Sequence, residues 1–311
     1  MPGRPSSPLT EHPLTERPDS AVMSHPGADR VKDVARLAGR SARSKRGAFL
    51  AEGPQAVREA LRRHRAGTPT VDQVFATDEA LTRHPELAEP ADGVILRRVT
   101  PDVLAAMSDT VTPQGVVAVC RMVDVTLDDV LAASPRLVAV LCQVRDPGNA
   151  GTILRAADSA GADAVILTHG SVDLYNPKAV RSTVGSLFHL PVVLGVPFTD
   201  LAGRLRDAGV AVLAADGYGT ADLDALQDAS AARRLGRAVS SMEPAAGEDP
   251  GPRLENPTAW LFGNEAHGLA EDERAAADAR VRVPVYGAAE SLNVGTAATV
   301  CLYASARAQR R

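Results

Sequence analysis

The chain has 311 residues, of which 45% are hydrophobic, and its formal net charge at pH 7 is −4. This length exceeds what one hydrophobic core usually holds, so two domains are expected. The acidic balance argues against a protein that binds nucleic acid through bulk positive charge alone, because domains of that class tend to be basic.

The sequence also argues against a membrane, disulfide-linked or zinc protein. No apolar run approaches the roughly 20 residues that span a bilayer, and the N-terminus lacks the apolar core of a signal peptide. Cys120, Cys142 and Cys301 lie far apart and form no Cys-x-x-Cys pair, so neither a disulfide framework nor a metal site is indicated. We therefore expect a cytoplasmic protein that binds no metal and no membrane.

The first third of the chain predicts a tail and a small α/β domain. Residues 1–29 are rich in Pro and Ser without apolar periodicity, which is typical of disorder. Apolar patterns then predict helices at residues 31–37 and 56–61 and strands at residues 49–51, 71–76, 94–96 and 115–120. Alternation of this kind indicates an α/β domain over residues 30–122, followed by a linker over residues 123–135.

Basic residues are concentrated at the start of this domain. Between Arg30 and Arg65 the chain carries eleven Lys and Arg residues and only three acidic ones. Such a segment can form a phosphate-contacting face, although most charge runs are only solvated helix surfaces. The candidate RNA-binding residues are Arg36, Arg40, Arg43, Lys45 and Arg46.

Residues 136–311 repeat strand and helix patterns, which predict a parallel sheet with helices on both faces. The repeat is interrupted at residues 229–257, a segment rich in Ala, Gly, Pro and charge with no apolar core of its own. We expect this insertion to be a mobile loop. No Gly-x-Gly-x-x-Gly follows the first strand, so a dinucleotide-binding fold has little support.

Three polar segments in this second domain each follow an apolar strand and precede a helical pattern. They read Asp-Pro-Gly-Asn-Ala-Gly-Thr-Ile-Leu-Arg-Ala-Ala at residues 146–157, Trp-Leu-Phe-Gly-Asn-Glu-Ala-His-Gly-Leu at 260–269, and Ala-Glu-Ser-Leu-Asn-Val-Gly-Thr-Ala-Ala at 289–298. The third follows a strand expected at residues 281–285 and places Ser291 and Asn293 at a helix N-terminus, where free N–H groups favour a ligand.

Each segment also has a structural explanation when taken alone. Pro147-Gly148-Asn149 is a good turn and helix cap, and Arg155 has the pattern of a surface salt-bridge partner. Ser291 and Asn293 can merely cap the last helix. The functional interpretation is favoured because all three segments occur together at matched strand ends.

In this order, the three segments resemble the motifs of the SpoU/TrmH family of RNA ribose 2′-O-methyltransferases. The resemblance implies a SPOUT fold, in which the parallel sheet of residues 136–311 contains a deep trefoil knot. A weaker similarity, carried by residues 49–53 and 112–116, implies that residues 30–122 form an L30e-like RNA substrate-binding domain.

The family likeness also implies S-adenosylmethionine as the cofactor, RNA as the partner and a homodimer. It places the catalytic groups at Arg155, Asn149, Glu265, Ser291 and Asn293. We expect Arg155 to orient the phosphate and stabilise the developing alkoxide. A role as a base is disfavoured because the guanidinium stays protonated at neutral pH and so has no free site for another proton. The residues that the resemblance assigns to the cofactor pocket are Leu261, Phe262, Gly263, Glu265, Gly268, Val283, Pro284, Val285, Tyr286, Ser291, Leu292 and Asn293.

Two histidines were considered as bases and set aside. His189 stands between Leu187-Phe188 and Leu190-Pro191, a context typical of a core or loop histidine, and His267 is expected to lie beside the cofactor at most.

The substrate is the least determined part of the prediction. Ribosomal RNA is favoured over transfer RNA because of the additional N-terminal domain, an argument by analogy of fold. The other open classes are an RNA-binding or ribosome-assembly protein that has lost catalysis, and a small-molecule methyltransferase, which would not need the basic segment.

Overall fold

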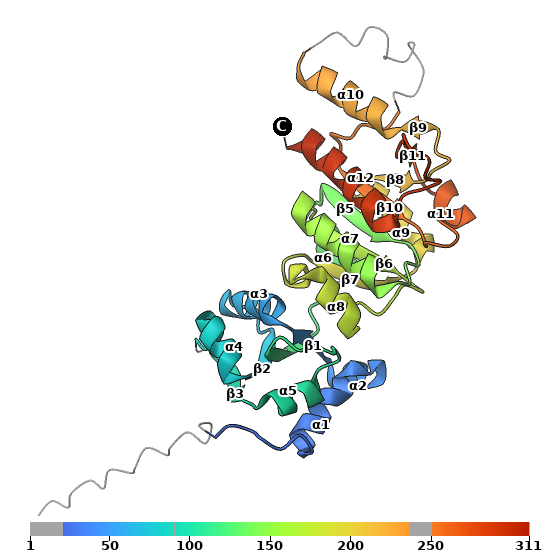
Figure 1. Ribbon diagram of the computed structural model, residues 1–311. Helices are drawn as coiled ribbons and strands as arrows, with labels where there is room; N and C mark the ends of the chain where they lie inside the picture. Colours follow the sequence, from blue (N-terminus) through green and yellow to red (C-terminus); the bar gives the residue numbers. More distant parts are fainter. Residues whose placement is uncertain (1–20, 90, 237–250, 311) are drawn as a thin grey trace, which may run out of the picture.

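The structure is a computed structural model that describes residues 21–89, 91–236 and 251–310. It consists of two α/β domains, the N-terminal one lying below the C-terminal one in Figure 1. Order begins earlier than the sequence predicts. Met23 pairs with Val99 in an isolated parallel bridge, and its N–H donates to the carbonyl of Arg98 at 2.9 Å. The predicted tail is therefore wrong for residues 21–29, while residues 1–20 lie outside the described ranges.

The N-terminal domain is built on a four-stranded sheet of order β1-β4-β2-β3. Strand β4 pairs antiparallel with β1 and β2, and β3 joins β2 in parallel. The strands are β1 (Ala48–Glu52), β2 (Val71–Ala76), β3 (Ile95–Arg98) and β4 (Val116–Arg121). The helices are α1 (Asp29–Ala35), η1 (Arg36–Ala38), α2 (Arg40–Arg46), α3 (Pro54–Arg65), α4 (Asp78–Arg83), η2 (Pro85–Leu87) and α5 (Pro101–Met107).

The C-terminal domain contains a parallel seven-stranded sheet of order β7-β6-β5-β10-β8-β11-β9. Its strands are β5 (Leu137–Leu141), β6 (Ala164–Thr168), β7 (Val192–Val196), β8 (Ala211–Ala215), β9 (Ala221–Asp222), β10 (Thr258–Phe262) and β11 (Ala279–Arg282). Its helices are α6 (Leu127–Ala132), α7 (Pro147–Ala160), α8 (Pro177–Thr183), η3 (Ser186–Phe188), α9 (Phe198–Asp207), α10 (Leu223–Arg234), α11 (Glu271–Ala275) and α12 (Val294–Gln309). The predicted α/β fold class is confirmed.

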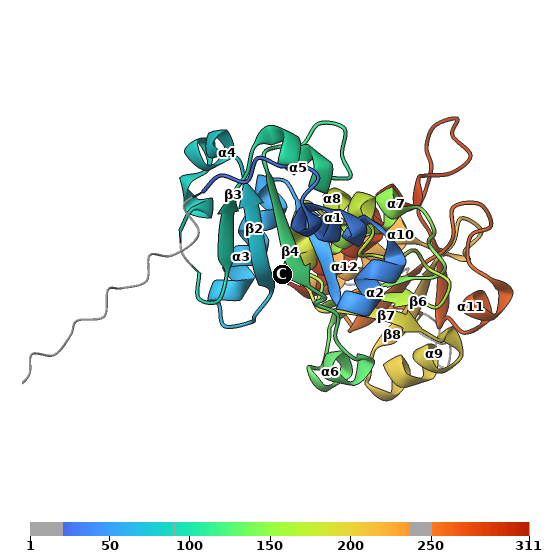
Figure 2. The same cartoon turned by 90° about the horizontal axis from the view of Figure 1, so that it is seen from below.

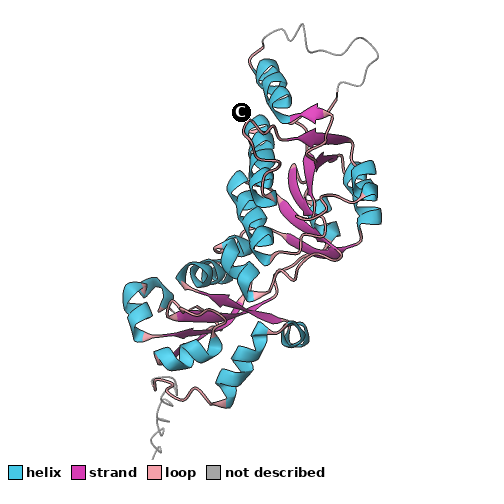
Figure 3. Cartoon of the chain, turned by 45° about the vertical axis from the view of Figure 1, so that its right-hand side comes forward, coloured by secondary structure: helices cyan, strands magenta, loops and turns pink. Residues whose placement is uncertain are grey.

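Helices cover both faces of this sheet, as Figure 3 shows. Every residue of β5, β6 and β10 is buried. In β5, Leu137 and Leu141 face a core shared with α7 and α12, whereas Val138 and Val140 face a second core shared with α6 and α9. A central strand buried on both sides is apolar at nearly every position, and in these three strands the exceptions are the terminal residues Thr168 and Thr258.

Strand β10 enters the middle of the sheet late in the chain. Trp260 lies opposite Ala139 of β5 on one side and Leu213 of β8 on the other. The Trp260 side chain is fully buried, and its indole N–H donates to Ser305 Oγ of α12 at 2.9 Å. This insertion between earlier strands is consistent with the knotted topology that the family resemblance implies. The knot itself stays a prediction.

Three segments differ from the expectations drawn from sequence. The predicted linker contains α6, which is capped by Thr126 and buries Leu127 and Val130 in the C-terminal core. The predicted insertion begins too early, because α10 continues to Arg234. At its far end Leu254 is buried, and residues 237–250 lie outside the described ranges. Strand β11 ends at Arg282, so the predicted strand over residues 281–285 is placed too late.

Polar contacts join the two domains, and Arg43 of α2 makes the most buried of them. Its guanidinium donates to Asp173 Oδ2 at 2.6 Å and to the carbonyls of Leu37 and Ala38. A second ion pair has its arginine in the C-terminal domain: Arg181 of α8 lies 3.1 Å from the carboxylate of Glu52 in the N-terminal domain. Figure 1 shows α8 directly above β1 where the domains meet, in agreement with the contacts between these two elements, and Figure 2 shows the same junction from below.

An aromatic cluster lies beside these ion pairs. The rings of Phe49 in β1 and Tyr175 before α8 have centroids 4.6 Å apart. The ring of Phe188 stacks with that of Phe49, and their centroids are 6.0 Å apart. The Tyr175 hydroxyl accepts hydrogen bonds from the backbone N–H groups of Val123 and Asp124 and donates to the Asp124 carboxylate. The interface therefore combines apolar burial with hydrogen-bonded polar groups, which fixes the relative placement of the domains. Among the described residues, Arg43 Nε is an exception, being buried without a hydrogen bond.

Helices α7 and α8 approach so closely at Gly151 that no side chain fits. A Cβ at this position would lie 1.9 Å from Ser182 Oγ and 2.8 Å from the Ala179 carbonyl oxygen. We expect Gly151→Ala to lower the free energy of unfolding by about 1–3 kcal/mol, as overpacked cores do. The matched control is Gly203→Ala in α9, where nothing lies within 4 Å and a gain of about 0.5–1 kcal/mol is expected. Denaturant titration of both variants checks this, and equal effects at the two sites would contradict it.

Candidate active site at the ends of three strands

The three polar segments meet at one edge of the C-terminal sheet. Strands β5 and β10 are parallel neighbours, so the turns that follow them leave the sheet on the same side. The segment after β11 returns to this edge as α12 packs along α7 and β10. Residues separated by more than 140 positions in sequence are thereby brought into contact.

The side-chain amide of Asn149 forms the centre of the site. Its Nδ2 donates to Glu265 Oε1 at 2.8 Å, and its Oδ1 accepts from Asn293 Nδ2 at 3.1 Å. One residue from each segment is thus linked in a single hydrogen-bonded chain. The structure brings together three of the five residues proposed as catalytic.

The turn that carries Asn149 is held by an acidic helix cap. The Asp146 side chain accepts from the backbone N–H of Asn149 at 2.9 Å and forms an ion pair with Lys178 at 3.2 Å. The hydrogen bond from Asn149, together with Lys178, keeps the pKa of Asp146 below its ordinary value. Pro147 occupies the first helical position, where no N–H is needed.

The segment after β10 forms a closed turn. The backbones of Asn264 and Gly268 exchange hydrogen bonds, and the Asn264 side chain donates to the carbonyl of Gln143 at 3.0 Å. Gly263 serves this turn directly, because a Cβ there would lie 2.3 Å from the carbonyl carbon of Gly268. The turn presents the Glu265 carboxylate to Asn149.

The segment after β11 leaves its backbone unpaired. Within the described residues, the structure records no backbone hydrogen bond for residues 285–292. Val285 and Leu292 flank this stretch with 39% and 37% exposure, large values for apolar side chains. Asn293 then caps α12 by accepting from the N–H of Gly295 at 2.9 Å. Open N–H and C=O groups beside apolar side chains suit a small planar ligand.

Other predicted residues lie outside this hydrogen-bonded chain. Arg155 and Ser291 are exposed, and no hydrogen bond or ion pair is recorded for either side chain in the described part of the chain. Val283 and Pro284 are partly buried at the end of β11, and the Tyr286 hydroxyl contacts Asp224. Leu261 and Phe262 are buried in β10, so their side chains belong to the core and only the strand end faces the site.

Two supporting residues escaped sequence reasoning. Asp146 caps α7, and an Asp directly before a Pro at the first helical position is the signal that could have identified it. Gln143 has φ +53°, an unusual conformation for a residue other than glycine, and its carbonyl receives the Asn264 amide. A backbone conformation of this kind has no sequence signal.

The described residues contain no group of three or more His, Cys, Asp and Glu side chains that could hold a metal ion. They also contain no helix long and apolar enough to cross a membrane.

Comparison with known proteins gives this arrangement a family. Residues 136–303 match the model of the SpoU rRNA methylase family, and residues 28–118 match the MRM3-like substrate binding domain. The first match covers more than half of the chain. The chain belongs to the SpoU rRNA methylase family.

Individual relatives agree with this assignment. The chain is 35% identical over 275 residues to the 23S rRNA (guanosine(2553)-2′-O)-methyltransferase RlmP of Bacillus subtilis, covering 88% of this chain and 94% of the relative. It is 32% identical over 216 residues to the 23S rRNA (uridine(2479)-2′-O)-methyltransferase of Streptomyces viridochromogenes, covering 67% of this chain and 66% of the relative.

Solved structures show the same fold. An RNA 2′-O ribose methyltransferase matches with a TM-score of 0.72 at 28% identity, covering 93% of this chain and 99% of that structure. The SpoU methyltransferase AviRb from Streptomyces viridochromogenes, in complex with AdoMet, matches with a TM-score of 0.71 at 29% identity, covering 90% of this chain and 98% of that structure. The predicted class, an RNA 2′-O-ribose methyltransferase that uses S-adenosylmethionine, is confirmed.

The hydrogen bond between Asn149 and Glu265 predicts that a negative charge at position 149 lowers the rate of methyl transfer. Asn149→Asp keeps the size of the side chain but cannot donate to Glu265, and it places two carboxylates at hydrogen-bonding distance. We expect methyl transfer to fall by at least tenfold while the thermal midpoint changes little, because the site is at the surface. Rates measured under single turnover check this. Asn149→Ala, which adds no charge, should retain more activity, and the opposite ranking would contradict the argument.

Proposed function

We propose that this protein transfers a methyl group from S-adenosylmethionine to a ribose 2′-hydroxyl of ribosomal RNA in the cytoplasm. The observation that carries the proposal is the hydrogen-bonded chain from Glu265 through Asn149 to Asn293. The relatives from Bacillus subtilis and Streptomyces viridochromogenes are named as 23S rRNA 2′-O-methyltransferases, which favours the RNA of the large ribosomal subunit over transfer RNA.

The loop at residues 283–293 fits the cofactor. Its unpaired backbone groups suit the edge of an adenine ring, and Val285 and Leu292 offer apolar contacts on either side. Gly263 and Gly268 shape the opposite wall through the turn after β10. We assign to this pocket the backbone at the ends of β10 and β11 together with Glu265, Tyr286 and Ser291. When bound, the cofactor supplies an electrophilic methyl carbon.

The residues of this chain then position the acceptor oxygen. Transfer forms a carbon–oxygen bond as the methyl–sulfur bond breaks, and the hydroxyl proton leaves for solvent or a nearby acceptor. Arg155 lies two turns along α7 from Asn149, exposed and without a partner in the described residues. We assign it to the ribose-adjacent phosphate and to the negative charge that develops on the oxygen. Asn149 and Glu265 fix the loops on which this geometry depends.

A face of α2 suits the RNA backbone. Lys45 and Arg46 are exposed and make no ion pair within residues 21–89, 91–236 and 251–310, and Arg40 reaches Asp173 only at 4.0 Å. Arg36 is exposed but bonded to Asp33. Arg43 does not fit the predicted role, because its side chain is only 2% exposed. Its terminal nitrogens are already bonded to the Asp173 carboxylate and to two backbone carbonyls. The proposed RNA-contacting set is therefore Arg36, Arg40, Lys45 and Arg46.

A separate cavity lies between the domains. It measures about 330 Å³ and is lined by Gly53 and Gln114 from the N-terminal domain and by Arg181 from α8. Gln114 is exposed, with no recorded hydrogen bond. RNA that crosses from α2 to the catalytic loops passes this junction, where unpaired amide groups are available to a nucleotide.

We further propose that two copies of the chain form a homodimer through α12. Val300 and Tyr303 are 37% and 49% exposed on this helix. They line a hollow of about 620 Å³ with Ser159 and Ala160 at the end of α7. A second copy of the same helix would cover these apolar side chains in a self-complementary contact.

The proposed activity is tested with methyl-labelled S-adenosylmethionine and unmodified ribosomal or transfer RNA. We expect label on a ribose 2′-oxygen of ribosomal RNA, with Arg155→Ala losing at least 100-fold in rate while still binding the cofactor. Mass spectrometry of nuclease fragments locates the label. Transfer to transfer RNA alone would move the proposal to that substrate. Cofactor binding without transfer to either RNA would favour a non-catalytic role.

The α2 face makes a separate prediction about salt. We expect Lys45→Gln/Arg46→Gln to weaken RNA binding and to reduce the slope of log affinity against log salt by roughly 1–2, because two phosphate contacts are lost. Arg204→Gln/Arg206→Gln in α9 removes the same charge from residues paired with Asp128 and Asp278. Fluorescence anisotropy between 50 and 200 mM salt compares the two variants. An equal change of slope in both would mean that α2 has no specific role.

A further inference from the structure

A carboxylate lies beside the arginine assigned to the RNA. Asp158 follows Arg155 by three positions in α7, a spacing at which opposite charges on a helix surface commonly pair. Arg155 is nevertheless without an ion pair in the described residues. An ion pair with Asp158 would occupy the guanidinium that we assign to the RNA phosphate.

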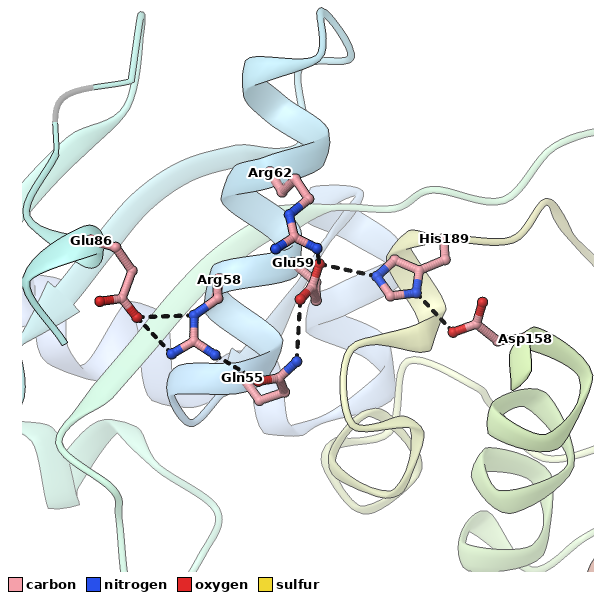
Figure 4. A network of polar contacts seen from close by, with 7 residues as sticks. All are labelled: Gln55, Arg58, Glu59, Arg62, Glu86, Asp158 and His189. Carbon is pink, nitrogen blue, oxygen red and sulfur yellow. Dashed lines mark hydrogen bonds and ion pairs between the residues drawn. The ribbon is translucent and has the colours of Figure 1, made fainter. Parts of the chain in front are cut away.

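His189 accounts for the missing pair. Its Nδ1 lies 2.8 Å from Asp158 Oδ2, and its Nε2 lies 3.1 Å from Glu59 Oε2 in the N-terminal domain. Figure 4 shows the ring between these two carboxylates. Donating to both requires a proton on each ring nitrogen. Partial burial lowers the pKa of His189, but the hydrogen bonds to Asp158 and Glu59 outweigh this and raise it above its ordinary value.

The rest of the network holds His189 in place. Glu59 is nearly buried and also accepts from Arg62 at 2.8 Å and from Gln55 at 3.2 Å. Arg63, on the same helix α3, donates to the carbonyl of Phe188 at 3.2 Å. Gly185, with φ +95°, lets the chain before η3 approach Glu59, since a Cβ there would lie 2.8 Å from Glu59 Cγ.

We propose that His189 is a positioning residue that holds Asp158 away from Arg155 and so keeps the guanidinium free for the RNA. Through Glu59, the restraint is anchored in the substrate-binding domain. This inference rests on the proposed role of Arg155 and names a residue that acts on it without touching the substrate.

The inference predicts a rescue that a purely structural role does not. His189→Ala releases Asp158, and an exposed pair of this kind lowers the fraction of free Arg155 by about two- to fivefold. We expect the single-turnover rate at saturating cofactor and RNA to fall by that factor. Adding Asp158→Asn removes the competing charge, so the double variant His189→Ala/Asp158→Asn should return to the rate of Asp158→Asn alone.

Asp158→Asn by itself gives a second measurement, one that remains if His189→Ala folds poorly. Its rate should equal or exceed that of the wild type. A loss as large as that of His189→Ala would overturn the inference, because the contact itself would then matter. Failure of the double variant to recover would overturn it equally.

The same experiment is repeated in an Arg155→Ala background to separate this inference from the proposed function. If Arg155 acts as assigned, Arg155→Ala is slow and His189→Ala has no further effect on it. If Arg155→Ala is as fast as the wild type, the role of Arg155 fails first. If Arg155→Ala is slow and His189→Ala lowers the rate again by the same factor, His189 acts independently of Arg155 and only the present inference fails.

Discussion

The amide of Asn149 is the interaction on which the arrangement of the site depends. A side-chain amide can donate to a carboxylate through its NH2 group and accept from another amide through its oxygen at the same time. An ionised Asp in the same place could only accept. Its donation to Glu265 and acceptance from Asn293 join the turns after β5 and β10 to the start of α12. The sheet supplies the coarse placement, because β5 and β10 are neighbours, and the amide supplies the fine placement of the loops.

The domain interface applies a different principle to the same end. Burying a charge costs several kcal/mol unless it is paired and hydrogen-bonded. The two terminal nitrogens of Arg43 are bonded to one carboxylate and two carbonyls, while its Nε has no partner in the described residues. Removing one partner of such a set is more destabilising than its net contribution suggests. The interface therefore selects one relative orientation of the domains, in which α8 packs on β1.

Much of this site could be predicted from the sequence because its residues lie in short motifs that directly follow predicted strands. The apolar patterns at residues 137–144 and 258–262 predict strands, and the turns after them can be read from the sequence; the first strand ends earlier than predicted, at Leu141. Arg43 was misassigned because its partner, Asp173, lies 130 positions away, and a basic residue in a charge run gives no sign of burial. Helix α6 was assigned to a linker because Leu127 and Val130 are too few to show a period. Likewise, the chain is ordered from before Met23 because the backbone of Met23 is hydrogen-bonded to residues 98–100. Backbone pairing of this kind leaves no pattern of side chains in the sequence.

His189 shows how a residue that sequence reasoning sets aside can still bear on function. It was expected to be a core or loop histidine, and its ring is indeed held inside a network at the interface. The network, however, runs from α3 of the N-terminal domain to α7, the helix that carries both Asn149 and Arg155. An ion pair on an exposed helix is weak, so a single competing contact is enough to decide whether it forms. The N-terminal domain can in this way set the charge environment of α7 through Glu59 and His189.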